Sequence, residues 1–230
     1  IMVYTALFYL LINCDFFLVS RLLEGEAGRR ATGDYYSQLN VARIVWQGTF
    51  AITVVIFPLV SKVVAEGDPE RTRSYISQAL RFTLIIAGFL AVCFSSNASS
   101  VLPLLFPKGF GADATPLRIM AFSKLGFAMF MICTTALSGS GRPWTSALLV
   151  LITLIVSAAL NLLAIPTHGL VGAAVATLVA MVVGVVTGLA LLARHFRAYV
   201  PPASAVRVGT IMAICWIASY SLDLGGKVAD

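Results

Sequence analysis

The run LVLITLIV at residues 149–156 decides the class of fold. Strands of a membrane barrel alternate between apolar and polar side chains. This run is apolar at every position except Thr153, so it predicts a helix. The wider stretch at 144–165 is long enough to cross the hydrocarbon core, which takes about 20 mostly apolar residues.

Six further stretches have the same character. They lie at about 1–20, 39–60, 75–96, 117–138, 170–193 and 205–222. Of the 230 residues, 59% are apolar and 11% are charged, and the mean hydropathy is +0.93. A soluble domain carries about 25% charged residues, and disordered chains are poorer in apolar ones. The sequence therefore predicts an all-α integral membrane protein, a bundle of about seven transmembrane helices.

The basic residues predict how the chain is oriented. A net charge of +6 in so apolar a chain does not indicate nucleic-acid binding. Lys and Arg are instead enriched in the cytoplasmic loops of membrane proteins. The loops after the second, fourth and sixth stretches hold more of them than the other loops, which predicts a cytoplasmic start and an external end. The loop at 61–74 is expected to be a solvated connector, partly helical.

Two parts of the chain are expected. Residues 1–193 would form a six-helix lobe, and residues 194–230 a connector with one additional transmembrane helix. Because Ile1 already lies inside an apolar run, we expect the C-terminal part of a longer protein, whose N-terminal lobe is absent here. The cysteines fall on separate helices and the histidines are single loop residues, so no metal site and no cofactor is predicted.

Small residues recur at four-residue steps in the sixth stretch. They are Gly172, Ala176, Ala180, Gly184 and Gly188. Helices in lipid associate by close packing of such residues. We expect this row to pack against a neighbouring helix of the same chain, the alternative being a contact between two copies.

Asp15 lies in the apolar run LLINCDFFLVS, more than one turn from Arg21 at its end. Intramembrane charges are costly and usually line a pathway or pair with another charge. Asp15 is therefore expected to face a wet cavity, to be protonated, or to meet a partner, such as an arginine on a neighbouring helix in a structural ion pair.

A polar stripe runs along the start of the second stretch. Tyr36, Asn40, Arg43 and Gln47 recur at i, i+4, i+7 and i+11, so they share one face of a helix. Such a stripe needs water or protein beside it. We interpret it as the lining of a cavity, the alternative being an anchor at the membrane interface.

Two further stretches carry polar groups. Lys124 lies about two turns inside the fourth stretch, and Thr153, Ser157 and Asn161 form a row in the fifth. Several helices thus show one polar face, with cations slightly in excess. This pattern predicts a wet cavity that receives a polar, anionic group.

Several segments resemble one known family. They are NCDFFLVS (13–20), GDYYSQLNVAR (33–43), FPLVSKVVAEGD (57–68), VLPLLFPKGFGADATPLRIMAF (101–122), ALSGSGRP (136–143) and NLLAIPTHGLVGAAVATL (161–178). Their order and spacing resemble the polysaccharide-transporter and oligosaccharide-flippase branch (Wzx-like) of the multidrug/oligosaccharidyl-lipid/polysaccharide (MOP) exporter superfamily. The resemblance implies two six-helix lobes around a central cavity, of which this chain would be the C-terminal one.

The resemblance also implies a function. The protein would move a lipid-linked saccharide, such as an O-antigen precursor on a polyprenyl phosphate, across the bacterial cytoplasmic membrane by alternating access. We expect Arg43 and Lys124 to hold the anionic head. Asp15 would be an ion-coupled switch or a structural counter-ion, and Asn40, Gln47 and Asn161 would line the cavity.

Two alternatives remain open. A multidrug exporter of the same superfamily would have a more apolar and acidic cavity than the cationic stripe indicates. A membrane-embedded polysaccharide polymerase or ligase would need acid and base groups on a sizeable external loop. No loop here exceeds roughly 22 residues or carries a cluster of histidine and carboxylates, so no catalytic residue is predicted. No phosphate-binding GxxxxGK[ST] motif occurs either.

Overall fold

The computed structural model describes residues 2–23, 25–106 and 113–198 and, beyond these, 206–211, 213, 214 and 216. Every regular element in these residues is a helix, which confirms the predicted all-α class but not the number of seven transmembrane helices. The helices are α1 (Met2–Leu22), α2 (Gly25–Gln47), α3 (Phe50–Ala65), α4 (Pro69–Ser96), α5 (Ala98–Leu105), α6 (Thr115–Gly139) and α7 (Pro143–Phe196). Half of the predicted seventh stretch at 205–222 lies outside the described residues.

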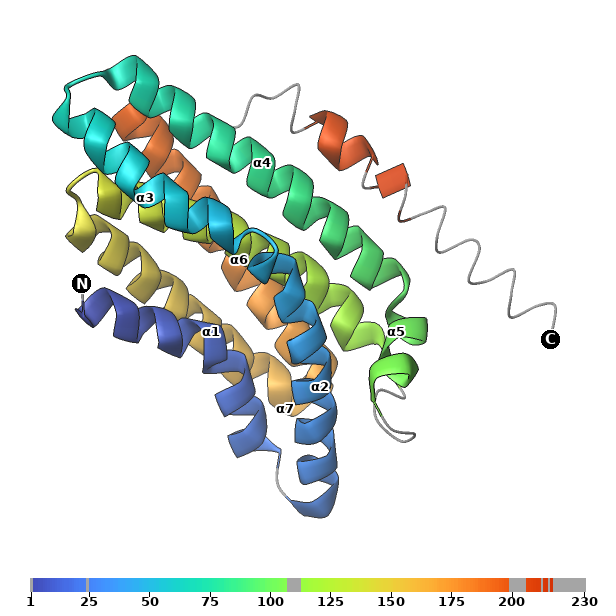
Figure 1. The fold of residues 1–230 in the computed structure, drawn as a ribbon. Helices are drawn as coiled ribbons and strands as arrows, with labels where there is room; N and C mark the ends of the chain where they lie inside the picture. Colours follow the sequence, from blue (N-terminus) through green and yellow to red (C-terminus); the bar gives the residue numbers. More distant parts are fainter. Residues whose placement is uncertain are drawn as a thin grey trace.

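Helix α7 contains two of the predicted stretches. Its 54 residues would span about 80 Å as a straight rod, far more than one membrane crossing. The chain turns back at Gly169, whose φ of 55° and ψ of −133° are not helical (Figure 1). The two arms on either side of Gly169 correspond to the predicted stretches 144–165 and 170–193.

The second predicted stretch, 39–60, falls on two helices and not on one continuous helix. The chain forms α2 and α3 instead, which are bent by 42° at a short break. The break falls at Gly48 and Thr49, where the Thr49 hydroxyl bonds to the Trp46 carbonyl. Helix α2 also begins at Gly25, well before residue 39. Among the described residues, α1, α4, α6 and α7 are long and apolar enough to cross a membrane, and the bent pair brings the number to five.

The connector between α3 and α4 is shorter than the expected loop at 61–74. Helix α3 continues to Ala65, and α4 begins at Pro69. Asp68 precedes α4, and its side chain accepts a hydrogen bond from the Arg71 backbone N–H at 3.0 Å, an N-cap that fixes where the helix starts. Both helices therefore extend nearly to this turn.

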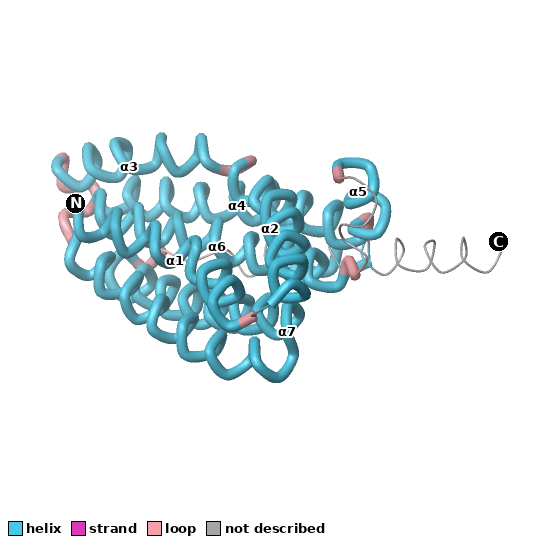
Figure 2. Tube along the Cα trace, turned by 90° about the horizontal axis from the view of Figure 1, so that it is seen from below, coloured by secondary structure: helices cyan, strands magenta, loops and turns pink. Residues whose placement is uncertain are grey.

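Helix α6 lies at the centre of the bundle, in contact with α2, α3, α4 and α7 (Figure 2). In its most apolar stretch 67% of the residues are buried, against 17% in α1. Phe127, Phe130 and Leu137 of α6 belong to the main apolar core. A charged residue on α6 must therefore find its partner inside the bundle.

The small residues of the second α7 arm lie against other helices of the same chain. A Cβ at Gly184 would lie 2.9 Å from Thr153 on the first arm and 3.1 Å from Phe130 on α6. A Cβ at Gly188 would lie 3.0 Å from the Cβ of Cys133, also on α6. Gly172, Ala176 and Ala180 are buried in the same arm. We expect this close approach to hold the second arm to the core.

The ends of the helices gather in two groups. Figure 1 shows the start of α1, the turns α3–α4 and α6–α7 and the last residues of α7 at one end of the bundle. The α1–α2 turn, α5 and the break in α7 lie at the other end. This grouping agrees with the alternation of loops used for the charge count, and it collects Arg71, Arg142 and Arg194 at one end.

Candidate functional site

Asp15 lies within α1 and is 2% exposed. Its Oδ2 atom accepts a hydrogen bond from the Tyr35 hydroxyl of α2 at 3.1 Å, and its Oδ1 accepts one from the Phe16 backbone N–H at 2.8 Å. The Lys124 ammonium of α6 lies 3.9 Å from the same Oδ2. Residues from three helices thus meet at one carboxylate.

Lys124 is 3% exposed, because it projects from the central helix. Two unit charges 3.9 Å apart attract by about 4 kcal/mol at an effective dielectric constant of about 20. Taking each ion out of water costs several kcal/mol. The ion pair therefore adds little net stability, but removing one partner would leave the other charge buried and uncompensated. The partner of Asp15 is a lysine, not the arginine expected in a structural pair.

A polar network continues from Asp15 into α7. Thr177 of the second arm lies near the Tyr35 hydroxyl, and Thr177 Oγ1 lies 3.4 Å from Asn161 Nδ2 of the first arm. The Asn161 amide donates to the Ser157 carbonyl at 2.9 Å, while its Oδ1 is buried without a hydrogen-bond partner. Ser157 in turn reaches Cys14 on α1. The network ties the two arms of α7 to α1 and α2.

Arg43 lies on α2 and is half-buried. Its Nη2 donates to Asn13 Oδ1 of α1 at 3.0 Å, and its Nη1 donates to Asn40 Oδ1 at 3.3 Å. Its Nε is buried without a hydrogen-bond partner. Within the described part of the chain no carboxylate forms an ion pair with it. Neutral side chains therefore hold this guanidinium in place and leave its charge uncompensated.

The other members of the stripe lie beside Arg43. Asn40 is half-buried, Tyr36 is 45% exposed and packs on Phe16 of α1 with ring centroids 5.2 Å apart, and Gln47 is exposed at the end of α2. We define these three residues, with Arg43 and Asn13, as the α1–α2 polar face. It combines one fixed cation with amides and a phenol, groups that can donate hydrogen bonds to an oxygen-rich ligand.

The structure separates the two cations expected to hold an anion. Arg43 lies on the half-buried α1–α2 polar face, whereas Lys124 is directed at Asp15 inside the bundle. Their positive charges are still close enough to interact. Asn161 belongs to the buried network, and Gln47 lies one turn beyond Arg43.

Two residues of the network were not predicted. Tyr35 and Thr177 join Asp15 to Asn161, but neither stands out in an apolar sequence. A signal existed for Tyr35, because the segment DYYSQLN has polar residues on a second face, Tyr35 and Gln38, spaced i and i+3. Gln38 Oε1 accepts a hydrogen bond from the Leu117 backbone N–H at 2.8 Å and so fixes the start of α6 against α2.

In the described residues no group of three or more His, Cys, Asp or Glu side chains could hold a metal ion. Separately, the one arginine and the neutral donors of the α1–α2 polar face are groups that can hydrogen-bond an anion or hydroxyl groups.

The fold of the chain is that of solved MATE transporters. A MATE transporter solved in complex with MaD5 matches with a TM-score of 0.73 and 16% identity, over 97% of this chain and 52% of that one. The Vibrio cholerae MATE transporter VcmN in its bent form matches with a TM-score of 0.71 and 16% identity, over 99% and 53%. A MOP superfamily transporter from Pyrococcus furiosus matches with a TM-score of 0.68 and 17% identity, over 97% and 51%. The chain thus spans about half the length of these transporters.

The particular family follows from the sequence. The profile of the family described as "Lipid II flippase MurJ" matches residues 2–226, and the chain belongs to this family. The resemblance to the flippases of the MOP superfamily is thereby confirmed.

Two curated relatives share about a quarter of the matched residues. The probable low-salt glycan biosynthesis flippase Agl15 of Haloferax volcanii is 26% identical over 156 residues, 67% of this chain and 33% of the relative. An uncharacterised membrane protein of Methanocaldococcus jannaschii is 25% identical over 151 residues, 65% and 30%. The matched part is therefore about a third of each relative.

Proposed function

We propose that this chain is the C-terminal lobe of a flippase that carries a lipid-linked saccharide across the cytoplasmic membrane. The family supports a substrate of this class, and so does the name of the Haloferax relative. The carrier lipid would be of the polyprenyl-phosphate type, so that the group to be moved is a polar head with a negative charge. An N-terminal lobe would complete the cavity, and rocking of the two lobes would expose the head to each side in turn.

The observation that carries this proposal is the environment of Arg43. Two amide oxygens orient its guanidinium, its Nε has no hydrogen-bond partner, and no carboxylate of the described residues neutralises it. A guanidinium binds phosphate through parallel hydrogen bonds, which makes arginine well suited to a phosphate-bearing head. Asn40 and Gln47 would supply hydrogen bonds to the sugar or phosphate oxygens.

Lys124 and Asp15 take a different role in the proposal. Their separation of 3.9 Å supports Asp15 as a structural counter-ion of Lys124. The pair would keep α1, α2 and α6 in register behind the α1–α2 polar face, and Arg43 would be the cation left to meet the substrate. A cationic drug would be repelled there, which disfavours the multidrug alternative.

Replacement of Arg43 tests the proposal. In the full-length protein, reconstituted in vesicles, Arg43→Ala should slow the translocation of a lipid-linked saccharide by roughly 10- to 100-fold, since a hydrogen bond to a charged group contributes about 1.5–3 kcal/mol. Arg43→Lys should retain part of the rate because it keeps the charge but loses the bidentate geometry. Accessibility of the saccharide to an impermeant reagent measures the rate.

Arg30→Ala is the matched control, since Arg30 is an exposed cation on the same helix. It should leave the rate unchanged. Equal rates for Arg43→Ala and Arg30→Ala would overturn the role of Arg43. Faster efflux of a cationic drug by the Arg43→Ala variant would instead favour the multidrug alternative.

A further inference from the structure

A basic pocket of about 540 Å³ lies where the α3–α4 turn meets the last residues of α7. Gly67, Asp68 and Thr72 line it on the side of the turn, and Arg194, His195 and Arg197 line it on the side of α7. It is remote from the α1–α2 polar face in the chain and involves none of its residues. The proposed function gives it no role.

The pocket carries a net positive charge. Its one carboxylate, Asp68, is engaged by Arg71, whose Nε lies 3.3 Å away, and by the N-terminus of α4. His195 bonds through Nδ1 to the Leu191 carbonyl. The guanidinium groups of Arg194 and Arg197 form no ion pair with a carboxylate of the described residues. These two charges are available to an anion.

The backbone at Arg197 supports a functional reason for its position. Arg197 has a φ of 51°, and within the described residues it is the only non-glycine residue with a positive φ. Helices commonly end in this left-handed conformation, but usually with glycine or asparagine, which adopt it at lower cost. The end of α7 therefore tolerates a strained arginine at the rim of the pocket.

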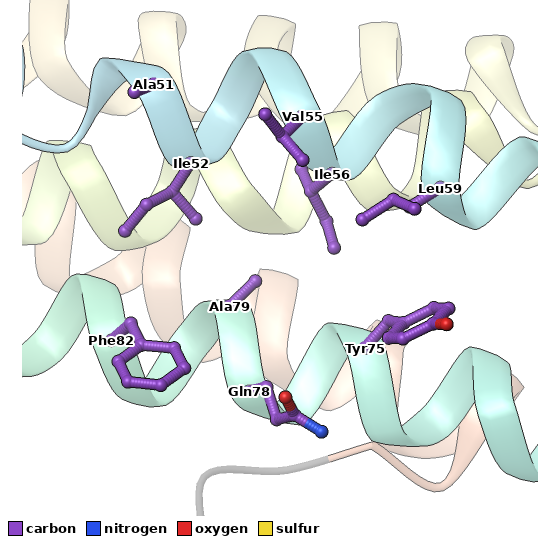
Figure 3. A pocket seen from close by; sticks show the side chains of 9 residues that line it. All are labelled: Ala51, Ile52, Val55, Ile56, Leu59, Tyr75, Gln78, Ala79 and Phe82. Atoms are coloured by element: carbon purple, nitrogen blue, oxygen red, sulfur yellow. The ribbon is translucent and has the colours of Figure 1, made fainter.

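An apolar groove of about 440 Å³ lies between α3 and α4, the two helices that the turn at the pocket joins. Figure 3 shows Ile52, Ile56 and Leu59 of α3 facing Tyr75, Ala79 and Phe82 of α4 across it. Its walls are almost entirely apolar, apart from Gln78 and the Tyr75 hydroxyl.

The groove and the pocket are close together along α4. Tyr75 lies at the end of the groove nearest the turn, and Thr72, which lines the pocket, is about 4.5 Å further along the helix axis. A ligand that bridges both needs an anionic end and an apolar tail. Since the groove lies on a membrane helix pair, the surrounding bilayer supplies such molecules.

We propose that the basic pocket and the apolar groove together bind one anionic phospholipid. Its phosphate lies between Arg194 and Arg197, and one acyl chain lies in the groove between α3 and α4. The lipid bridges α3, α4 and the end of α7, and so couples the second arm of α7 to the α3–α4 pair. This site does not depend on which substrate the protein transports.

Lipid titration of the full-length protein in neutral detergent tests this site. Phosphatidylglycerol binding, followed by native mass spectrometry, should be strong, and binding of zwitterionic phosphatidylcholine weak. Arg194→Gln and Arg197→Gln should each weaken phosphatidylglycerol binding by about fivefold, the effect of one basic residue near an anionic membrane surface. Arg142→Gln should not weaken it, because Arg142 is exposed at the same end of the bundle outside the pocket.

A second variant tests the groove. Ala51 is exposed at the far end of the groove, so Ala51→Phe should fill part of it without disturbing the core, and should weaken binding of the two-chain lipid. Inorganic phosphate should compete only weakly with phosphatidylglycerol for the basic pocket. If the Arg194, Arg197 and Arg142 variants bind phosphatidylglycerol equally well, the basic pocket is not the lipid site. Binding of inorganic phosphate as tight as that of the lipid, or no effect of Ala51→Phe, would overturn the bridging lipid.

Discussion

At the scale of single residues, the charged side chains inside the bundle have two kinds of surroundings. Asp15 and Lys124 neutralise one another in the interior, with Tyr35 completing the shell of the carboxylate. Arg43 is held by neutral amides, and no carboxylate of the described residues forms an ion pair with it. The first arrangement serves the architecture of the lobe, and the second is suited to recognition.

The buried pair predicts non-additive mutations. Lys124→Met should lower the free energy of unfolding by about 3–5 kcal/mol, because it leaves Asp15 buried without its counter-ion. Asp15→Asn should also lower the free energy of unfolding. The double variant Asp15→Asn/Lys124→Met should lose less of this free energy than the two single variants lose together. Denaturant unfolding of the full-length protein in detergent measures the coupling.

Lys62→Met provides the control for this cycle. Lys62 is 74% exposed in its side chain and pairs with Glu66 at 3.9 Å, so its loss should have an effect near zero. Additive effects of the Asp15 and Lys124 variants would mean that the two charges are not coupled in solution.

The sequence predicted which residues are unusual better than it predicted their partners. Asp15 and Arg43 stand out because a charge in an apolar run is costly. Lys124 was expected in a cavity because periodicity does not reveal that α6 is the central helix of the bundle. Tyr35 was missed because its partner Asp15 lies 20 residues away on another helix. The sequence of either helix alone does not show which residues of the two helices pair.

At the scale of the helices, breaks decide the architecture. Gly169 turns α7 back on itself and places its two arms side by side, with Gly184 of one arm against Thr153 of the other. The break between α2 and α3 was not predicted because it falls at Gly48 and Thr49, with no proline beside it. Pro58, by contrast, lies inside α3. The length of the apolar runs predicted which stretches could cross the membrane. Local hydrogen bonds determine where the helices begin and bend.

Close packing of the second α7 arm makes a prediction at Gly184. Gly184→Ala should lower the free energy of unfolding by about 1–3 kcal/mol, the usual cost of overpacking, because its Cβ would lie 2.9 Å from the stiff Thr153 side chain. Gly209→Ala is the control, since a Cβ there meets nothing within 4 Å. Thermal unfolding in detergent reports the difference. A dimer that dissociates in Gly184→Ala with unchanged monomer stability would instead support a contact between copies.

At the scale of the whole molecule, the chain is one lobe-like bundle that covers about half of each matched transporter. We propose that its α1–α2 polar face lines a cavity shared with the N-terminal lobe. The α1–α2 polar face must then be in contact with water, although most other residues of α1 are apolar. The exposed apolar residues of α3, such as Val54 at 56% exposure, should face lipid.

Thiol accessibility at Asn40 tests this central claim most directly. In the full-length protein with its natural cysteines replaced, including the four of this chain, Asn40→Cys should react with a membrane-impermeant maleimide, and a lipid-linked saccharide should slow that reaction. Val54→Cys on the lipid-facing side should not react. An Asn40→Cys thiol that is as unreactive as Val54→Cys, or whose reaction the saccharide leaves unchanged, would contradict a water-filled face that receives the substrate.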